Sequence, residues 1–216
     1  RVDARLQTIL RVGERERALE SRINLSVEGP PLYQARLSLP VDMKLEQVSA
    51  PGAFEWAITQ SDTGPLLSIY LAAAQRGSVS ILVTGTLGDP GPVDQLPLPR
   101  LSVLDVASQE GDIVVQGDPG CRIDARDLVN CQTIPLSRAH TWLTEAQRPL
   151  ARFALHYRQS DFGGTVTLCH RQADVTCHTI TNIRVTGRAI EETVLLVAER
   201  RVQPRAKRLG QRRAAL

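Results

Sequence analysis

Hydrophobic and polar side chains alternate with a period of two along much of the chain. Residues 2–12 start the pattern, and residues 19–27 and 33–39 continue it after the polar stretch 13–16 and the Gly29-Pro30-Pro31 sequence. Successive side chains of a β-strand leave opposite faces of the sheet, so this pattern is typical of half-buried antiparallel strands. Three such segments with short connections predict a β-meander.

Short strands are also predicted further along the chain. They cover residues 54–58, 66–73, 79–87, 101–106, 113–115, 153–157, 165–170, 175–180, 183–185 and 193–198. Arg76-Gly77 predicts a turn between two of them, and residues 137–147 predict one short helix with Ser137, Thr141 or Thr144 as its N-cap. We therefore expect an all-β fold. It would be an antiparallel β-sandwich of one body or of two packed halves, with at most one short helix.

The chain divides by composition into a sandwich region and a basic tail. Residues 1–199 form the predicted β-sandwich region, and the Pro- and Gly-rich stretch 88–100 is its expected internal boundary, either a linker or a crossover between sheets. Seven of the 26 basic residues lie in 200–216, which holds no acidic residue, so the formal charge of +3 becomes −4 for residues 1–199. The body therefore predicts no nucleic-acid surface, and the tail is interpreted as a solvated linker.

Length and hydrophobicity allow a substantial core. The chain has 216 residues, of which 42% are hydrophobic but only 4% aromatic, so we expect an aliphatic core with Trp56 and Trp142 as anchors. No apolar run approaches the ~18 residues of a membrane span, so we expect no membrane insertion. The first residue is Arg1 and not Met, and we expect the chain to be a piece of a longer protein.

Four cysteines predict two local disulfides. Cys121 and Cys131 bracket one short segment, and Cys169 and Cys177 bracket another that could fold as a hairpin about Ala173. Two bridges would indicate an oxidising compartment outside the cytoplasm. Free buried thiols are one alternative. A metal site is another, formed by Cys169-His170 and Cys177-His178, but adjacent residues of a strand point to opposite faces, which counts against four converging ligands.

Known catalytic motifs are absent from the sequence. It contains no H-E-x-x-H, G-x-S-x-G, P-loop or G-x-G-x-x-G pattern. Ser137 and His140 could join a distant Asp in a triad only as any long chain could, and His156 is interpreted as a solvent-facing or hydrogen-bonded strand residue. Turn chemistry explains the aspartates near Gly and Pro without calcium, namely Asp62, Asp89, Asp94, Asp112 and Asp118. We expect no catalytic residue, no metal, no cofactor and no enzymatic activity.

One stretch resembles a known group of proteins. The run from Leu37 to Val48, the Phe54-Glu55-Trp56-Ala57-Ile58 strand and the segment from Leu66 to Leu71 are similar to β-rich stretches of very large bacterial envelope proteins. In those proteins a strand ending in Leu-Pro is followed by Val, a Trp-containing strand and a hairpin. The resemblance covers residues 20–117 and implies an extracytoplasmic β-sandwich within a long chain. It implies no functional residue, and the cysteine region has no counterpart.

These observations favour a structural or interaction segment of a larger secreted or envelope protein, without enzymatic activity. Its partners would be other domains of the parent chain or another envelope protein. The alternative is a carbohydrate-binding or carbohydrate-active β-sandwich domain, which would require a cleft carrying Trp142, His140 and paired carboxylates.

Overall fold

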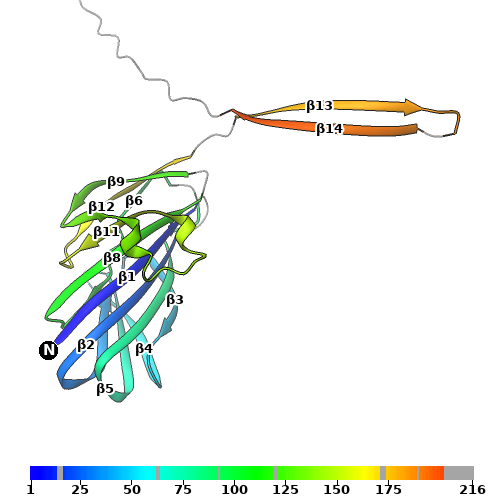
Figure 1. The fold of residues 1–216 in the computed structure, drawn as a ribbon. Helices are drawn as coiled ribbons and strands as arrows, with labels where there is room; N and C mark the ends of the chain where they lie inside the picture. The colour runs from blue at the N-terminus through cyan, green and yellow to red at the C-terminus, as the bar shows by residue number, and fades with distance from the viewer. Residues whose placement is uncertain are drawn as a thin grey trace, which may run out of the picture. The chain divides into compact units, whose positions relative to one another are not determined.

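The fold is all-β, as the alternating pattern predicted (Figure 1). A computed structural model describes residues 1–13, 17–61, 64–91, 93–118, 121–170, 174–188 and 190–201. The chain divides into two compact units, residues 1–170 and residues 171–216. The predicted boundary at 88–100 corresponds to the connection after β5, within the first unit, and the basic tail from residue 202 lies outside the described residues.

A nine-stranded sheet forms most of the first unit. Its order is β10-β11-β8-β1-β2-β5-β3, with β4 paired to β5 and β7 paired to β2. These strands are β1 (Val2–Val12), β2 (Arg17–Ser38), β3 (Met43–Ser49), β4 (Phe54–Ser61), β5 (Gly64–Leu87), β7 (Ser102–Val103), β8 (Ser108–Gly117), β10 (Cys131–Ile134) and β11 (Ala151–Tyr157). All pairs are antiparallel except β1 with β8, which run parallel.

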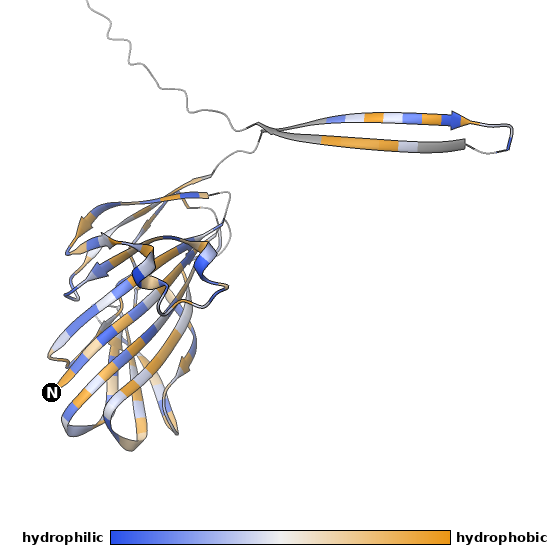
Figure 2. Ribbon diagram, viewed as in Figure 1, coloured by the Kyte–Doolittle hydropathy of each residue, from blue (hydrophilic) through white to orange (hydrophobic). Residues whose placement is uncertain are grey.

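A three-stranded sheet shares the main hydrophobic core with the large sheet. It has the order β6-β12-β9 and contains β6 (Gln95–Pro97), β9 (Cys121–Val129) and β12 (Gly163–His170). Its Ile123 and Val166 belong to the same buried cluster as Leu6 and Ile81 of the large sheet. The alternating apolar bands visible along the strands in Figure 2 are the inward-facing side chains of this sandwich.

Two long strands replace four predicted short ones. Gly29-Pro30-Pro31 and Arg76-Gly77 were expected to end strands, but β2 and β5 continue through both sequences. The β2–β5 register shifts between Val27 and Leu32, and Gly29 and Gly77 have positive φ values of 90° and 73°. The glycines accommodate a bend that other residues rarely adopt, so the strands bend there instead of stopping.

The helix predicted over 137–147 is much shorter than expected. It is reduced to α1 (Leu136–Ala139) and a separate 3-10 turn, η1 (Arg148–Leu150). None of the three proposed N-caps is used, because α1 begins after Pro135. The Thr141 hydroxyl donates to the Arg138 carbonyl, which offers the backbone an alternative to a continued helix. This segment covers the opposite face of the large sheet, where Ala139 and Leu143 form a second cluster with Val114.

The second unit contains a single antiparallel hairpin. Its strands are β13 (Asp174–Val185) and β14 (Ile190–Arg201), paired from Asp174 opposite Arg201 to Val185 opposite Ile190. None of the helices in the described part of the chain has the length and hydrophobicity needed to cross a membrane.

Candidate functional site

The β13–β14 hairpin exposes large apolar side chains on both of its strands. Seven of them have exposed fractions between 41% and 70%: Ile180, Ile183, Val185, Val194, Leu195, Leu196 and Val197. Figure 2 shows the apolar colour running without interruption through the middle of β14. Scattered exposed apolar residues are normal on protein surfaces, but a contiguous group of this kind marks an interaction site.

The hairpin has no core of its own among the described residues. β13 and β14 form a two-stranded sheet, and no other described strand pairs with either of them. A two-stranded sheet in water is only marginally stable by itself, because neither of its faces is covered. Its two outer edges also leave backbone donors and acceptors available to another strand. The hairpin is therefore a candidate surface for binding another protein segment.

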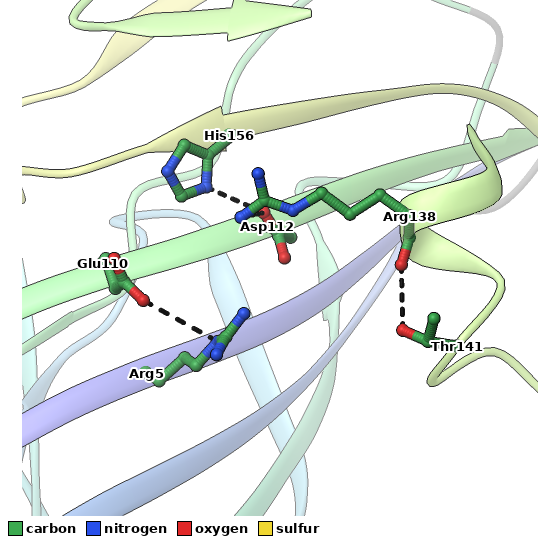
Figure 3. A network of polar contacts seen from close by, with 6 residues as sticks. All are labelled: Arg5, Glu110, Asp112, Arg138, Thr141 and His156. Carbon is green, nitrogen blue, oxygen red and sulfur yellow. Dashed lines mark hydrogen bonds and ion pairs between the residues drawn. The ribbon is translucent and has the colours of Figure 1, made fainter. Parts of the chain in front are cut away.

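A buried polar cluster lies between β8 and β11 in the first unit (Figure 3). Asp112 and His156 stand directly opposite each other, and the His156 Nδ1 atom is 2.8 Å from the Asp112 Oδ1 atom. The side chains are only 3% and 6% exposed. Arg138 extends from α1 over the pair, with its Nη2 atom 3.7 Å from the same carboxylate oxygen. The sequence interpretation of His156 as a hydrogen-bonded strand residue is therefore confirmed.

The Asp112–His156 cluster has a structural role that its geometry explains. Asp112 accepts from the His156 ring and lies near a guanidinium, so this buried carboxylate has two compensating partners. On the same face, Arg5 and Glu110 form an exposed pair 3.8 Å apart. Among the described residues, no group of three or more His, Cys, Asp or Glu side chains could hold a metal ion. The cluster ties β11 and α1 to β8.

Two surface hollows were compared with the predicted sites. One, of about 460 Å³, is lined by His156, Tyr157 and residues 130–132 and 158–159, and the other, of about 660 Å³, lies along residues 38–42 and 96–100. Neither is lined by Trp142 or His140. The structure therefore does not assemble the cleft that the carbohydrate-binding alternative requires.

The cysteines predicted to pair locally are not joined by local disulfides in the described structure. Cys131 and Cys169 are free thiols, and Cys121 is buried. Cys121 begins β9, whose last residue is Val129, so the strand holds its two ends roughly 25 Å apart at ~3.3 Å per residue. The predicted closed loop between Cys121 and Cys131 does not form, because these residues extend as a strand that pairs with β12.

The second predicted cysteine pair falls on two different units. Cys169 is exposed near the end of β12, and Cys177 lies in β13, opposite Ala198 of β14. The expected hairpin about Ala173 does not form, because β13 pairs with β14 and not with β12. The side chains of Cys177 and His170, which the metal hypothesis would need, lie outside those that the structure describes.

The tryptophans occupy different environments from those expected. Trp56 was predicted as a core anchor but is 47% exposed, because its strand β4 is at the edge of the large sheet. Trp142 is partly buried against the cluster around Val114, as a core anchor should be. The sequence analysis missed the functional interest of the hairpin, although the apolar run 194–198 followed by Arg200 and Arg201 was a usable signal.

Comparisons with known proteins leave the family open. No protein-family model and no curated protein matches the chain. Among solved structures, an M1 zinc metallopeptidase from Deinococcus radiodurans matches at 11% identity with a TM-score of 0.46, covering 90% of this chain and 47% of that one. The chain thus spans about half the length of this metallopeptidase.

Two further solved structures show the range of the similarity. Leukotriene A4 hydrolase from Saccharomyces cerevisiae matches at 11% identity and a TM-score of 0.41, covering 81% of this chain and 29% of that one. The seventh ScaB type I cohesin from Pseudobacteroides cellulosolvens matches at 13% identity and a TM-score of 0.33, covering 52% of this chain and 93% of that one.

The enzyme matches require one correction. The absence of catalytic motifs led to the prediction that the chain is not an enzyme, and the metallopeptidase and hydrolase chains contradict that exclusion. The similarity assigns no activity, substrate or site residue to this chain, because the TM-scores are below 0.5.

Proposed function

We propose that the chain is an interaction domain of a larger envelope or secreted protein, and that it binds a protein partner through the β13–β14 hairpin. The observation that carries the proposal is the exposure of seven large apolar side chains on a strand pair with two open edges among the described residues. Burying such side chains stabilises a complex by roughly 25 cal/mol per Å² of apolar surface removed from water.

The two units divide the work in this proposal. The first unit has an extensive core of its own, whereas the described part of the second has a hairpin with exposed side chains. The sandwich therefore serves as the scaffold, and the hairpin provides the contact surface. The extracytoplasmic location rests on the resemblance of residues 20–117 to envelope proteins, and fractionation of cells that produce the native protein would test it.

Hydrogen–deuterium exchange tests the hairpin as a binding surface. Amides of residues 174–201 should exchange rapidly in the dilute chain and slowly in the longer protein to which we assign it, because a bound partner covers the open edges. Leu196→Ser should remove that protection, since this side chain is 63% exposed and adds little to the unbound fold. Tyr33→Ser, at an exposed position on β2, is the control and should leave it intact. Equal exchange in both forms of the protein would rule out the proposal.

A further inference from the structure

The outer edge of β14 combines an apolar centre with opposite charges at its two ends. Glu191 and Glu192 occupy positions near the start of the strand, residues 194–198 are all apolar, and Arg200 and Arg201 end it. No described strand covers this edge. An open edge of this kind can accept another strand through backbone hydrogen bonds, while its sequence determines which strand fits.

We infer that the partner of this edge is β14 of a second copy of the chain, paired antiparallel about Leu196. The inference rests on the proposed function and names its partner. Antiparallel pairing brings the acidic start of one strand to the basic end of the other. With Leu196 opposite its own counterpart, Glu192 is in register with the second copy's Arg200, and Glu191 is in register with the second copy's Arg201.

The apolar residues support the same register. Leu195 lies opposite the second copy's Val197, and Val194 lies opposite its Ala198. A shift by one residue in one direction would place Glu192 opposite Glu199, and a shift in the other direction would place Val194 opposite Glu199. Both shifts are unfavourable, because like charges repel across a sheet and a carboxylate would face an apolar residue. The charges and the apolar centre therefore select one alignment.

The edge of β13 is a poorer match for its own copy. An antiparallel pair centred on Thr179 would place Asp174 opposite Arg184, but its centre would bring His178 opposite Ile180. It therefore offers one kind of charge pair where β14 offers two, and it has no apolar centre. The β14 edge is the one that the sequence equips for self-association.

The resulting assembly is closed and symmetric. Two hairpins joined through β14 form a four-stranded sheet in the order β13-β14-β14-β13, related by a two-fold axis. Residues directly opposite each other share a face of a sheet, so Val194 and Leu196 of both copies form one apolar surface. A four-stranded sheet is a more stable unit than the single hairpin, which explains how the exposed apolar residues persist.

Charge reversal at one pair of positions tests the inference in the full chain. Glu192 and Arg200 suit this purpose because their neighbours within the hairpin are the uncharged Ile183 and Val175. The wild-type chain should dimerise in sedimentation equilibrium. Glu192→Arg and Arg200→Glu should each raise the dimer Kd by about 10-fold or more, because each places like charges opposite each other twice. An equimolar mixture of the two variants should restore dimerisation, since each Arg then meets a Glu.

The outcomes separate this inference from the proposed function. A wild-type chain that stays monomeric at high micromolar concentration, or a mixture that fails to restore dimerisation, overturns the second copy as the partner. If the hairpin amides are nevertheless protected in the longer protein, the proposed function survives with another partner. Restoration by the mixture also shows that both variants are folded, so misfolding cannot imitate the expected result.

Cross-linking tests the register directly. Leu196→Cys should form an intermolecular disulfide with its own counterpart under mild oxidation, which peptide mass spectrometry identifies as a link between two copies of the substituted peptide. Val194→Cys is the matched control, because this exposed residue is on the same face but would stand opposite Ala198. Equal cross-linking at both positions would overturn the alignment about Leu196.

Discussion

The ring of Tyr157 lies directly over the backbone of Gly111, its partner across β8 and β11. A Cβ atom on Gly111 would stand 2.5 Å from the Tyr157 hydroxyl oxygen and 2.6 Å from its Cζ atom. The ring also stacks against Phe162, with the two ring centroids 4.1 Å apart and nearly parallel planes. Glycine at position 111 therefore creates the space that the buried tyrosine fills.

Gly111→Ala should lower the free energy of unfolding by about 1–3 kcal/mol, because the added methyl group overpacks a filled core. The Leu6 carbonyl oxygen would also be only 2.9 Å from the new Cβ, so backbone and ring would both have to shift. Urea denaturation of the full chain measures the loss. Gly163→Ala is the control, because a Cβ there meets no atom within 4 Å. Similar losses in both variants would contradict the packing explanation.

Tyr157 also makes stability depend on alkaline pH. Burial is the largest cause that raises the pKa of its phenol far above the ordinary value of 10.0, and nearby Asp112 adds to the rise while a hydrogen bond to Gln109 opposes it. The unfolded phenol loses its proton near pH ~10, whereas the folded one keeps it. Stability is therefore fully present below that pH and should fall by about 1.4 kcal/mol per pH unit above it.

Tyr157→Phe should remove this part of the alkaline slope. Urea unfolding of both proteins at several pH values above ~10 measures the difference. Tyr70→Phe is the matched control, because Tyr70 is exposed on β5, and it should keep the slope of the wild-type chain. A slope that Tyr157→Phe leaves unchanged would assign the alkaline loss to other groups.

Strand positions were predictable because alternation reports directly on a half-buried pleated surface. Residues 2–12 were predicted as a strand and form β1 with those limits. The bends in β2 and β5 were not predictable in the same way, since Gly29 and Gly77 occur equally in turns and in bent strands. Only the continued pairing of β2 with β5 beyond them distinguishes the two cases.

Long-range pairing explains what the sequence left open at the candidate sites. Asp112 and His156 are 44 residues apart, and their contact depends on the register of β8 with β11. Cys121 and Cys131 were predicted to close a loop because they are near in sequence, but the residues between them pair with β12 instead. In both cases the partner strand, and not the local sequence, determines which side chains meet.

Asp112→Ala should destabilise the first unit by about 1–3 kcal/mol, because it leaves the His156 ring buried without its acceptor. Asp112→Asn should cost less, since the amide oxygen can still accept from the ring. Glu110→Ala is the control on the same strand, because its exposed pair with Arg5 at 3.8 Å should contribute less than ~1 kcal/mol. Thermal unfolding of the three variants checks this order, and equal losses for Asp112→Ala and Glu110→Ala would contradict it.

The cysteines should react with alkylating reagents without prior reduction, and at different rates. Cys169 is exposed, whereas Cys131 is partly buried and its thiol donates to the Gly163 carbonyl oxygen at 3.3 Å. Burial is the main cause that raises the pKa of Cys131 above its ordinary value of 9.0, against backbone hydrogen bonds to Val129 and Gly163 that lower it. Because the thiolate is the reactive form, Cys169 should be labelled first by iodoacetamide, and the rate at Cys131 should still be rising above pH 9.0. Peptide mass spectrometry follows each site separately, and Cys169→Ser should leave the rate at Cys131 unchanged. Labelling of Cys131 and Cys169 only after reduction would instead show that disulfides form in the protein in solution.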